Sequence, residues 1–500
     1  MTSPHTRTRE ARLWTLLLAS SALYFFTTND ADPDLWGHLL FGREILANAA
    51  VPRVDGHAYT TMGQPWIDHE WLSQVVLAAI YGWSGSAGLL LLKLGIGALT
   101  LVLVVGSVRT RTQDAGIWGL VGLFTTAILA RGFAFRPQIF TYLGAAMVLA
   151  LLDYWQRGHR SVAWFLPLVF VLWVNLHGGV MLGLGMVAIF AAGQTLTDVA
   201  AARRAWGVWL ACGAATAVNP YGPELLGYIW TELSRPHPIT EWQAAVLTDP
   251  GQFAFFLMLA LFVATLPFAR QLRSQGWQVA LAACAAVLAL RYQRHTPVFA
   301  ICAAAPLAAQ LEEGRTWLLQ RRSIVLGPVS RWLITAALVS VIVVQTTLVV
   351  TRLRRDGLHI VYAPEDYPVT AVRAMQQIGS RANLAVPLEW GEYVLWFLAP
   401  HVKVSLDGRF ATVFPEQIVD DNFDFFAAAP GWRRLIDGYA TDAALVPRDS
   451  ACPIGTLSEW QLLYEDTTAR LYARVGGPAW SGLQQLRRDA HTPPVAGTFP

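Results

Sequence analysis

Three carboxylates lie close together near the start of the sequence, at Asp30, Asp32 and Asp34. Acidic groups this near one another repel unless a cation or a basic group offsets their charge. Their oxygens suit a hard divalent cation such as Mg²⁺ or Mn²⁺, and a single aspartate could equally act as general base on an acceptor hydroxyl or amide. We therefore predict that Asp34 and Asp32 are catalytic, either as base or as metal ligands. The competing interpretation is a solvated N-terminal cap on a helix over 34–47.

Polar residues continue along the same segment. His38 follows the first acidic group, and Asp68-His69-Glu70 forms a second one. Asp68 and Glu70 could complete a metal site or orient an acceptor, and we predict that they and His38 contact substrate. The alternative for Asp68 is that it caps the helix that follows it.

Two groups of arginines are candidates for binding an anion. Arg131 and Arg136 flank Gly-Phe-Ala-Phe, and Arg291, Arg294 and His295 lie within Arg-Tyr-Gln-Arg-His. Guanidinium groups bind phosphate through two parallel hydrogen bonds, so we predict that these residues hold a lipid phosphate. Snorkelling, or pairing with loop carboxylates, is the alternative.

Isolated polar residues extend the candidate set. We predict substrate contacts for His177, in Asn-Leu-His-Gly-Gly, and for Glu241. A tight glycine turn would account for the first without a function, and an ion pair with an arginine would account for the second. Two further segments, 389–393 and 405–409, follow expected strands, where α/β proteins gather their sites. Turn chemistry alone accounts for Asp-Gly in the latter.

The elements that must position these residues are mostly membrane spans. The chain is 54% hydrophobic and only 14% charged, whereas soluble domains carry about 25% charge. Apolar runs recur over the first 350 residues, and about 20 apolar residues cross a hydrocarbon core. We predict a polytopic α-helical membrane protein with spans at 12–28, 86–107, 115–130, 137–154, 162–176, 178–198, 205–218, 253–269, 277–290, 295–310 and 329–350.

The distribution of arginines orients these eleven spans. Short loops rich in Lys and Arg stay in the cytoplasm. If 69–83 does not span, every inner loop carries at least two basic residues, the N-terminus is cytoplasmic and the C-terminus lies outside. Segment 69–83 then becomes an amphipathic helix at the outer interface; a re-entrant helix or a twelfth span remains the alternative. This arrangement in the cytoplasmic membrane places all the candidate residues on the outer side.

The C-terminal part has a different character. Short apolar runs predict strands at 384–388, 402–406, 443–446, 461–464 and 469–475, with helices at 369–378, 391–398, 416–426 and 432–439. We predict a membrane domain over 1–350, which includes a first outer loop at 29–85, and a soluble α/β domain over 351–476. We expect 477–500 to be disordered.

The first outer loop resembles that of the GT-C superfamily of membrane glycosyltransferases. The resemblance rests on Ala31-Asp32-Pro33-Asp34-Leu35-Trp36, on Gly42-Arg43 and on Tyr59-Thr60-x-x-Gly63-Gln64-Pro65-Trp66. Oligosaccharyltransferase catalytic subunits also carry an Asp-Pro in this loop, and the likeness to protein O-mannosyltransferases and aminoarabinose transferases is more general. The Trp-Trp-Asp motif of oligosaccharyltransferases is absent, which puts protein N-glycosylation in doubt.

The resemblance implies transfer of a sugar from a polyprenyl phosphate or diphosphate to a glycan, lipid or protein acceptor of the cell envelope. It implies that Asp34 or Asp32 carries the catalytic carboxylate. Two other classes stay open: a transporter or flippase for an anionic lipid, which needs inner-side polar residues within the spans, and a non-catalytic assembly protein, which would tolerate alanine at both acidic groups. No nucleic-acid-binding pattern is present.

Overall fold

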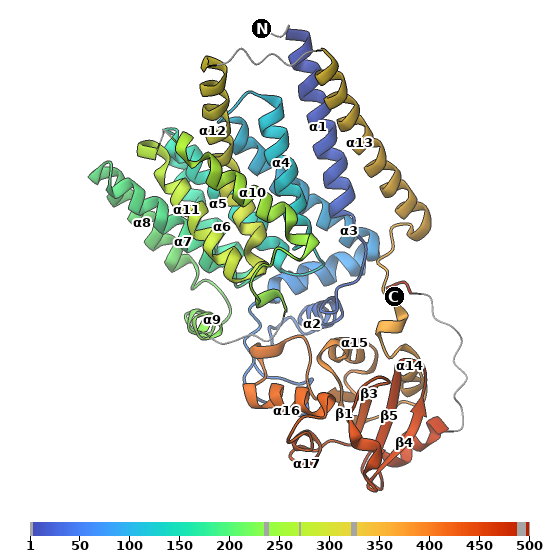
Figure 1. Cartoon of the computed structure of the whole chain (residues 1–500). Helices are drawn as coiled ribbons and strands as arrows, with labels where there is room; N and C mark the ends of the chain where they lie inside the picture. Colours follow the sequence, from blue (N-terminus) through green and yellow to red (C-terminus); the bar gives the residue numbers. More distant parts are fainter. Residues whose placement is uncertain (1–3, 235–239, 270–271, 322–327, 488–496, 500) are drawn as a thin grey trace. The chain divides into compact units, whose positions relative to one another are not determined.

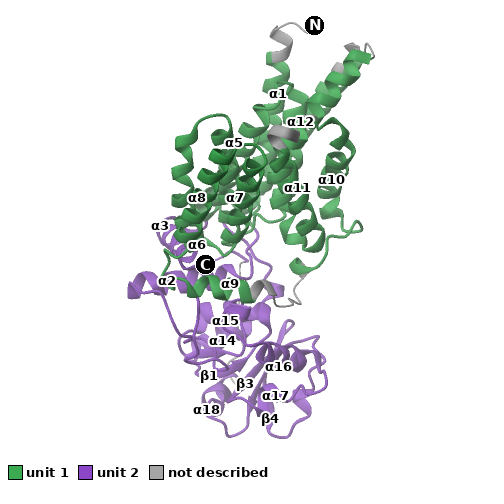
Figure 2. Ribbon diagram, turned by 90° about the vertical axis from the view of Figure 1, so that its left-hand side faces the viewer, with its two compact units in different colours: residues 1–29, 87–358 green, residues 30–86, 359–500 purple. Residues whose placement is uncertain are grey.

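The chain folds into two compact units in the computed structural model, which describes residues 4–234, 240–269, 272–321, 328–487 and 497–499. Unit 1 comprises Met1–Asn29 and Ala87–Leu358. Unit 2 comprises Asp30–Ser86 and His359–Pro500, so each unit combines segments that are far apart in the sequence (Figure 2).

Unit 1 is built of helices (Figure 1). Each predicted span falls on a helix, and residues 115–130 match a helix at both ends. The helices are α1 (Pro4–Phe26), the second part of α3 (Trp71–Arg109), α4 (Ala115–Ala130), α5 (Gln138–Gln156), α6 (Phe165–Leu176), α7 (Val180–Thr195), α8 (Val199–Ala215), α9 (Glu224–Ser234), α10 (Phe253–Thr265), α11 (Leu272–Arg291), α12 (Thr296–Arg321) and α13 (Pro328–Asp356).

Four helices within the described residues are long and apolar enough to cross a membrane, a judgement from length and composition alone. They are Trp71–Arg109, Gln138–Gln156, Pro250–Phe268 and Trp332–Asp356. Shorter apolar helices accompany them at Ala115–Ala130, Arg160–Leu176, Val180–Thr195 and Gly276–Arg291. The exact number of eleven spans stays a prediction.

Helix α3 is interrupted at Gly85, whose φ of 59° and ψ of −152° are non-helical. A side chain would be strained at this backbone conformation, so glycine suits the position. The break comes directly after the predicted interfacial segment 69–83, and the boundary between the two units follows at Ser86. The part before Gly85 is therefore separate from the span after it, whereas its depth in a membrane stays a prediction.

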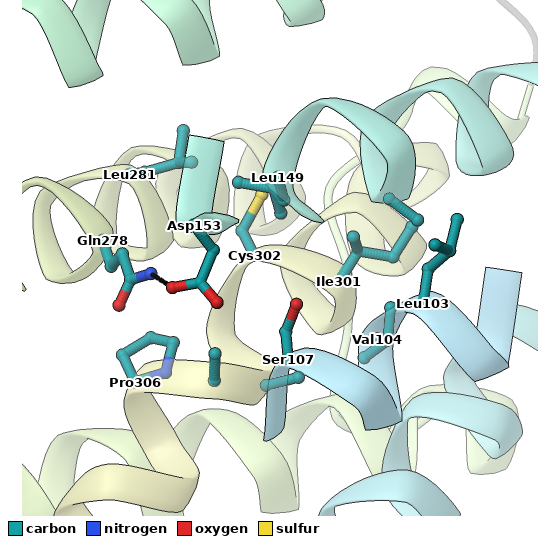
Figure 3. Close-up of a pocket in the computed structure, with 13 residues that line it drawn as sticks. Leu103, Val104, Ser107, Leu149, Asp153, Gln278, Leu281, Ile301, Cys302 and Pro306 are labelled. Atoms are coloured by element: carbon teal, nitrogen blue, oxygen red, sulfur yellow. Dashed lines mark hydrogen bonds between the residues drawn. The ribbon is translucent and has the colours of Figure 1, made fainter. Parts of the chain in front are cut away.

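One end of unit 1 holds a buried carboxylate that the sequence places within an apolar span. Asp153 pairs with Arg111 and, at 3.2 Å, with Arg157. Gln278 donates a hydrogen bond to the same carboxylate, beside a small cavity of about 20 Å³ (Figure 3). Charged groups within spans are expensive unless paired. Since Arg111 and Arg157 lie on two loops predicted to be cytoplasmic, their shared partner shows that these loops meet at one end of the unit.

Unit 2 contains a five-stranded sheet in the order β2-β1-β3-β5-β4. Strands β1 (Ala382–Ala385), β2 (Val402–Val404) and β3 (Ala443–Pro447) pair in parallel, whereas β4 (Trp460–Glu465) and β5 (Ala469–Arg474) complete it antiparallel. Helix α14 (Val369–Gln377) precedes the first strand, and α15 (Leu388–Leu398), α16 (Glu416–Ala427) and α17 (Arg434–Asp437) lie between the parallel strands in sequence. The first strand ends earlier than predicted, because Pro387 cannot donate to a strand ladder.

The predicted first outer loop belongs to unit 2. Its helix α2 spans Leu35–Asn48, close to the predicted 34–47. The backbone of Tyr59 donates to the carbonyl of Val404 at 3.0 Å, and Val404 donates to His57 at 3.1 Å. The sequence-based division instead assigned 29–85 to the membrane domain. The grouping differs because this segment satisfies hydrogen-bonding groups at the edge of β2, which no local pattern reveals.

The described part of the C-terminal tail contains short helical segments, whereas the sequence predicted disorder over 477–500. Helix α18 (Trp480–Leu483) is followed by a 3₁₀ turn, Gln484–Arg487. Phe499 donates its backbone N–H to Ile360 at 2.8 Å, and its ring stacks on Trp36 with 4.1 Å between centroids. An aromatic anchor buried in this way holds the end of the tail. Residues 488–496 and 500 lie outside the described part.

Candidate functional site

The start of α2 separates the roles of the two predicted catalytic aspartates. Asp34 occupies the N-cap position, but its side chain makes no capping hydrogen bond. Asp32 accepts the backbone N–H of Asp34 at 3.0 Å, the local bond by which an aspartate favours a turn. Asp32 therefore shapes the turn, and the carboxylate of Asp34 is directed elsewhere.

The carboxylate of Asp34 faces that of Glu392, which α15 supplies. A Cβ placed on Gly408 would lie 2.8 Å from Asp34 Oδ1 and 2.6 Å from Glu392 Oε1, so both oxygens converge on one point. Gly37 donates its N–H to Glu392 Oε2 at 3.0 Å. A Cβ at Gly37 would lie 2.2 Å from the Glu392 carboxyl carbon. The close approach of this carboxyl group thus requires glycine at both positions.

Glu392 is buried, and burial raises its pKa well above the ordinary value, with the nearby charges of Asp34 and Asp407 adding to the effect. Desolvation disfavours the charged form of a carboxyl group. Burial and the two acidic neighbours therefore favour the protonated form of Glu392. The sequence marked segment 389–393 because it follows an expected strand, but it gave no specific role to Glu392.

A buried arginine links the first loop to the segment after β2. Arg409 pairs with Asp55 at 2.6 Å and with Asp407 at 2.7 Å. Its guanidinium lies 4.7 Å from the ring centre of Trp66. Two carboxylates offset this charge within the protein interior, as a buried ion requires. Arg409 is thus a structural bridge, whereas the sequence marked its segment, 405–409, as one that follows an expected strand.

For the second acidic group, Asp68-His69-Glu70, the structure favours the interpretation that Asp68 caps the helix that follows it. Asp68 is buried and accepts hydrogen bonds from the Gln74 side chain at 2.9 Å and from the Glu70 backbone at 3.3 Å, just before the helix that begins at Trp71. Burial raises the pKa of Asp68 to about 7. Glu70 pairs with His69 at 3.5 Å. His38 is buried within α2.

The metal role of Asp32 and Asp34 stays a prediction. Within the described ranges, no three His, Cys, Asp or Glu side chains form a group that could hold a metal ion. Asp32 accepts the backbone N–H of Asp34 in the turn.

Unit 1 contains a cavity of about 230 Å³ that gathers the predicted phosphate ligands Arg131, Arg136 and Arg294. Arg136 pairs with Glu241 at 2.6 Å, and Arg131 pairs with Asp249 at 2.9 Å. Glu241 and Asp249 are loop carboxylates, so these pairs agree with the alternative interpretation that the arginines form ion pairs. All four side chains are partly exposed, and such pairs contribute little, so an anion can replace the carboxylates.

Arg294 differs from the other two arginines of the cavity. It forms no ion pair with a carboxylate in the described part of the chain; its guanidinium lies 4.4 Å from the ring centre of Trp242, and it donates to Gln138 at 3.5 Å. Arg291 is exposed, bonds to the Tyr292 hydroxyl at 3.0 Å and does not line the cavity. His295 also lies outside the lining.

His177 forms part of a tight turn. Its Nδ1 accepts the N–H of Gly179 at 2.9 Å and lies 2.8 Å from the hydroxyl of Thr141. An accepting Nδ1 places the proton of the neutral ring on Nε2. These bonds suit the turn interpretation, and His177 does not line the arginine cavity.

The cavity also holds residues that sequence reasoning missed. Gln138 and Tyr142 lie on a predicted span, where an apolar helix gives no signal for a site. Gln138 donates to the Tyr142 hydroxyl at 2.5 Å. A Cβ at Gly132 would lie 2.0 Å from this hydroxyl, so glycine makes room for it. Nearby in the same unit, Lys93 is buried and bonds to Thr28, with its ammonium 4.1 Å from the ring centre of Phe135.

Comparison by sequence finds no relatives: no family model matches the chain, and no curated protein does. Comparison by structure finds solved proteins of similar fold. An oligosaccharyltransferase from Archaeoglobus fulgidus, tethered to an acceptor peptide, matches with a TM-score of 0.56 and 10% identity, covering 87% of this chain and 69% of that one. ArnT from Cupriavidus metallidurans matches in the apo state with a TM-score of 0.54 and 12% identity, covering 94% and 98%.

ArnT bound to undecaprenyl phosphate also matches, with a TM-score of 0.50 and 11% identity over 93% of this chain and 97% of that one. Identities this low establish the fold alone. By length and composition, four helices of the described chain are also able to cross a membrane. The chain therefore has the GT-C-like fold that the resemblance of its first outer loop predicted.

Proposed function

We propose that this protein is a membrane glycosyltransferase that moves a sugar from a polyprenyl phosphate or diphosphate carrier to an acceptor. The observation that carries the proposal is the carboxylate of Asp34, which makes no capping hydrogen bond and faces the buried carboxyl group of Glu392. The fold supports it, because structures with this fold include an ArnT bound to undecaprenyl phosphate and an oligosaccharyltransferase tethered to an acceptor peptide.

The arginine cavity of unit 1 is assigned to the phosphate of the donor. Guanidinium groups form charge-assisted, bidentate bonds with phosphate oxygens. In transfer, the bond between the anomeric carbon and the phosphate oxygen breaks, and the oxygen keeps the electron pair. Arg131, Arg136 and Arg294 stabilise the negative charge that develops there. Gln138 offers a further polar group in the same cavity.

Asp34 is assigned to the acceptor. Its carboxylate takes the proton of the acceptor hydroxyl or amide as the new bond to the anomeric carbon forms. Burial and the nearby charges of Asp34 and Asp407 raise the pKa of Glu392, which disfavours a second negative charge beside the base. A base of this kind contributes about 10²–10⁴-fold to the rate.

The proposal includes the cytoplasmic membrane as location, with the N-terminus in the cytoplasm and residues 351–476 outside. The donor sugar is a hexose or a pentose. The acceptor is a glycan, a lipid or a protein of the cell envelope. A flippase would use the same arginines to hold a lipid phosphate, but it would release the lipid-linked sugar unchanged.

The test is consumption of a polyprenyl-phosphate sugar by envelope membranes that contain the full-length protein. Asp34→Asn should lower the rate by about 10²–10⁴-fold. Asp420→Asn, at an exposed aspartate of α16, is the control and should retain the wild-type rate. Unchanged transfer by Asp34→Asn would exclude the base, and movement of the intact donor across the bilayer would indicate a flippase.

A further inference from the structure

Unit 2 contains a cleft of about 1250 Å³ that the proposed mechanism does not use. One wall is the first-loop segment 30–33, immediately before Asp34. The others come from segment 361–367, from the start of α15, and from the turns that follow β3 and precede β5. Several separate segments of unit 2 thus enclose one space.

The floor of the cleft is aromatic and held in place. Tyr362, Tyr367 and Trp390 line it, and each is at most 9% exposed. The indole N–H of Trp390 donates to the carbonyl of Asp366 at 2.8 Å. The wall is fixed by a backbone bond of 2.7 Å from Ala31 to the carbonyl of Val361. Pre-formed concave sites with aromatic walls and a few polar groups are typical of ligand pockets.

The rim of the cleft carries strong negative charge. Five carboxylates line it, and none forms an ion pair with a basic residue in the described part of the chain; they are Asp30, Glu365, Asp366, Glu389 and Asp449. The one arginine, Arg448, is directed to Glu465 at 3.6 Å and to the carbonyl of Asp466 at 2.6 Å. The hydroxyl groups of Thr467 and Thr468 complete the polar lining.

We propose that this cleft binds the acceptor, and that the acceptor is a saccharide with free amino groups. This inference rests on the proposed function. The buried aromatic side chains give the cleft a fixed apolar floor. Its carboxylates accept hydrogen bonds from sugar hydroxyls, and its threonine hydroxyls accept or donate them. Ammonium groups match the uncompensated carboxylates, whereas a phosphorylated or uronic acid acceptor would be repelled.

The position of the cleft suits this role. Asp30, Ala31 and Pro33 form its wall, and Asp34 follows directly in the chain. The segment that would hold the acceptor therefore also carries the proposed base. The hydroxyl groups of a saccharide bound in the cleft would therefore already lie beside that segment.

The test uses three oligosaccharides of similar length: glucosamine oligomers, which are cationic, their N-acetylated forms, which are neutral, and oligogalacturonate, which is anionic. Binding to the purified full-length protein is measured by calorimetry. The cationic oligomer should bind most tightly and the anionic one least, with the difference reduced by salt because exposed charges are screened.

A matched pair of double variants separates specific binding from general attraction. Glu365→Gln with Asp449→Asn removes two charges from the rim and should weaken binding of the cationic oligomer about tenfold, with little change for the neutral one. Glu416→Gln with Asp420→Asn removes two exposed charges from α16 and should have no effect.

Three outcomes would overturn the inference: no saturable binding of any oligomer, equal weakening by both double variants, or tighter binding of the anionic oligomer. The Asp34→Asn variant keeps the result distinct from the proposed function. If that variant binds the cationic oligomer normally and transfer also continues normally, the base assignment fails while the acceptor cleft stands.

Discussion

The carboxyl groups of Glu392 and Asp34 converge on the backbone of Gly408, so one lies beside the other. Glu392 belongs to α15, and Asp34 stands at the N-cap of α2, more than 350 positions earlier. Two carboxyl groups this close cannot both ionise without strong repulsion. The fold therefore pairs a proposed base with an acid that keeps its proton.

Glu392→Gln should alter the pH dependence of stability. The pKa of Glu392 is raised in the folded protein from an ordinary 4.5, so its contribution is fully present below pH 4.5 and is lost as the pH rises through the raised value. Glutamine cannot ionise, so the variant should lose less thermal stability between pH 4.5 and neutrality. Thermal unfolding in detergent across this range checks it, with Glu389→Gln, an exposed neighbour, as control. Parallel curves for wild type and Glu392→Gln would contradict the assignment.

Arg409→Met should destabilise unit 2 strongly. The substitution keeps most of the volume but leaves Asp55 and Asp407 buried without their partner, which costs about 3–5 kcal/mol. Arg433→Met is the control, because its pair with Asp437 is exposed and such pairs contribute little to stability. The midpoint of thermal unfolding measures both. Equal midpoints for the two variants would show that Arg409 is not a structural bridge.

Arg294→Gln and Arg136→Gln should weaken the binding of undecaprenyl phosphate. Loss of a charge-assisted hydrogen bond costs about 1.5–3 kcal/mol, or about 10- to 100-fold in affinity. Arg291→Gln, on an exposed arginine that does not line the cavity, should bind normally. Native mass spectrometry of the purified protein with added lipid provides the measurement. A larger loss at Arg291 than at Arg294 would place the phosphate elsewhere.

Gly37→Ala should disturb the carboxyl pair. The new methyl group would lie 2.2 Å from the Glu392 carboxyl carbon, and overpacking of this kind costs about 1–3 kcal/mol. Gly82→Ala is a matched control, since no atom lies within 4 Å of its Cβ position and alanine favours the helix there. Reduced thermal stability and reduced transfer are expected for Gly37→Ala alone. Wild-type behaviour of Gly37→Ala would be inconsistent with the packing.

The predicted orientation is open to cysteine labelling. In a background without the exposed Cys284, Leu247→Cys should react with an impermeant reagent from outside the cell. Arg203→Cys, which is also exposed, should react only after permeabilisation, because the connection between predicted spans 178–198 and 205–218 carries two arginines. Labelling of Arg203→Cys in intact cells would invert the topology and place the arginine cavity on the cytoplasmic side.

Much of the fold follows from local patterns. Residues 115–130 form a helix as predicted, because a continuous apolar run satisfies its backbone only within itself in lipid. Strand β3 lies over Ala443–Pro447, close to the predicted 443–446. Within the candidate site, one cavity gathers Arg131, Arg136 and Arg294 from the predicted set, without Arg291 and His295, and phosphate binding there stays a prediction.

Contacts between segments that are distant in the sequence were decided by the tertiary structure alone. The facing of Glu392 and Asp34, the bridge from Arg409 to Asp55 and the pairing of 57–60 with β2 leave no periodic trace in the sequence. Burial is likewise a property of the folded chain, and it is burial that keeps Glu392 protonated. The sequence determined which segments are removed from water, because the apolar area of a segment depends on its own residues. The fold decided which polar groups those segments bring together, because charge and desolvation act between residues that are distant in the chain.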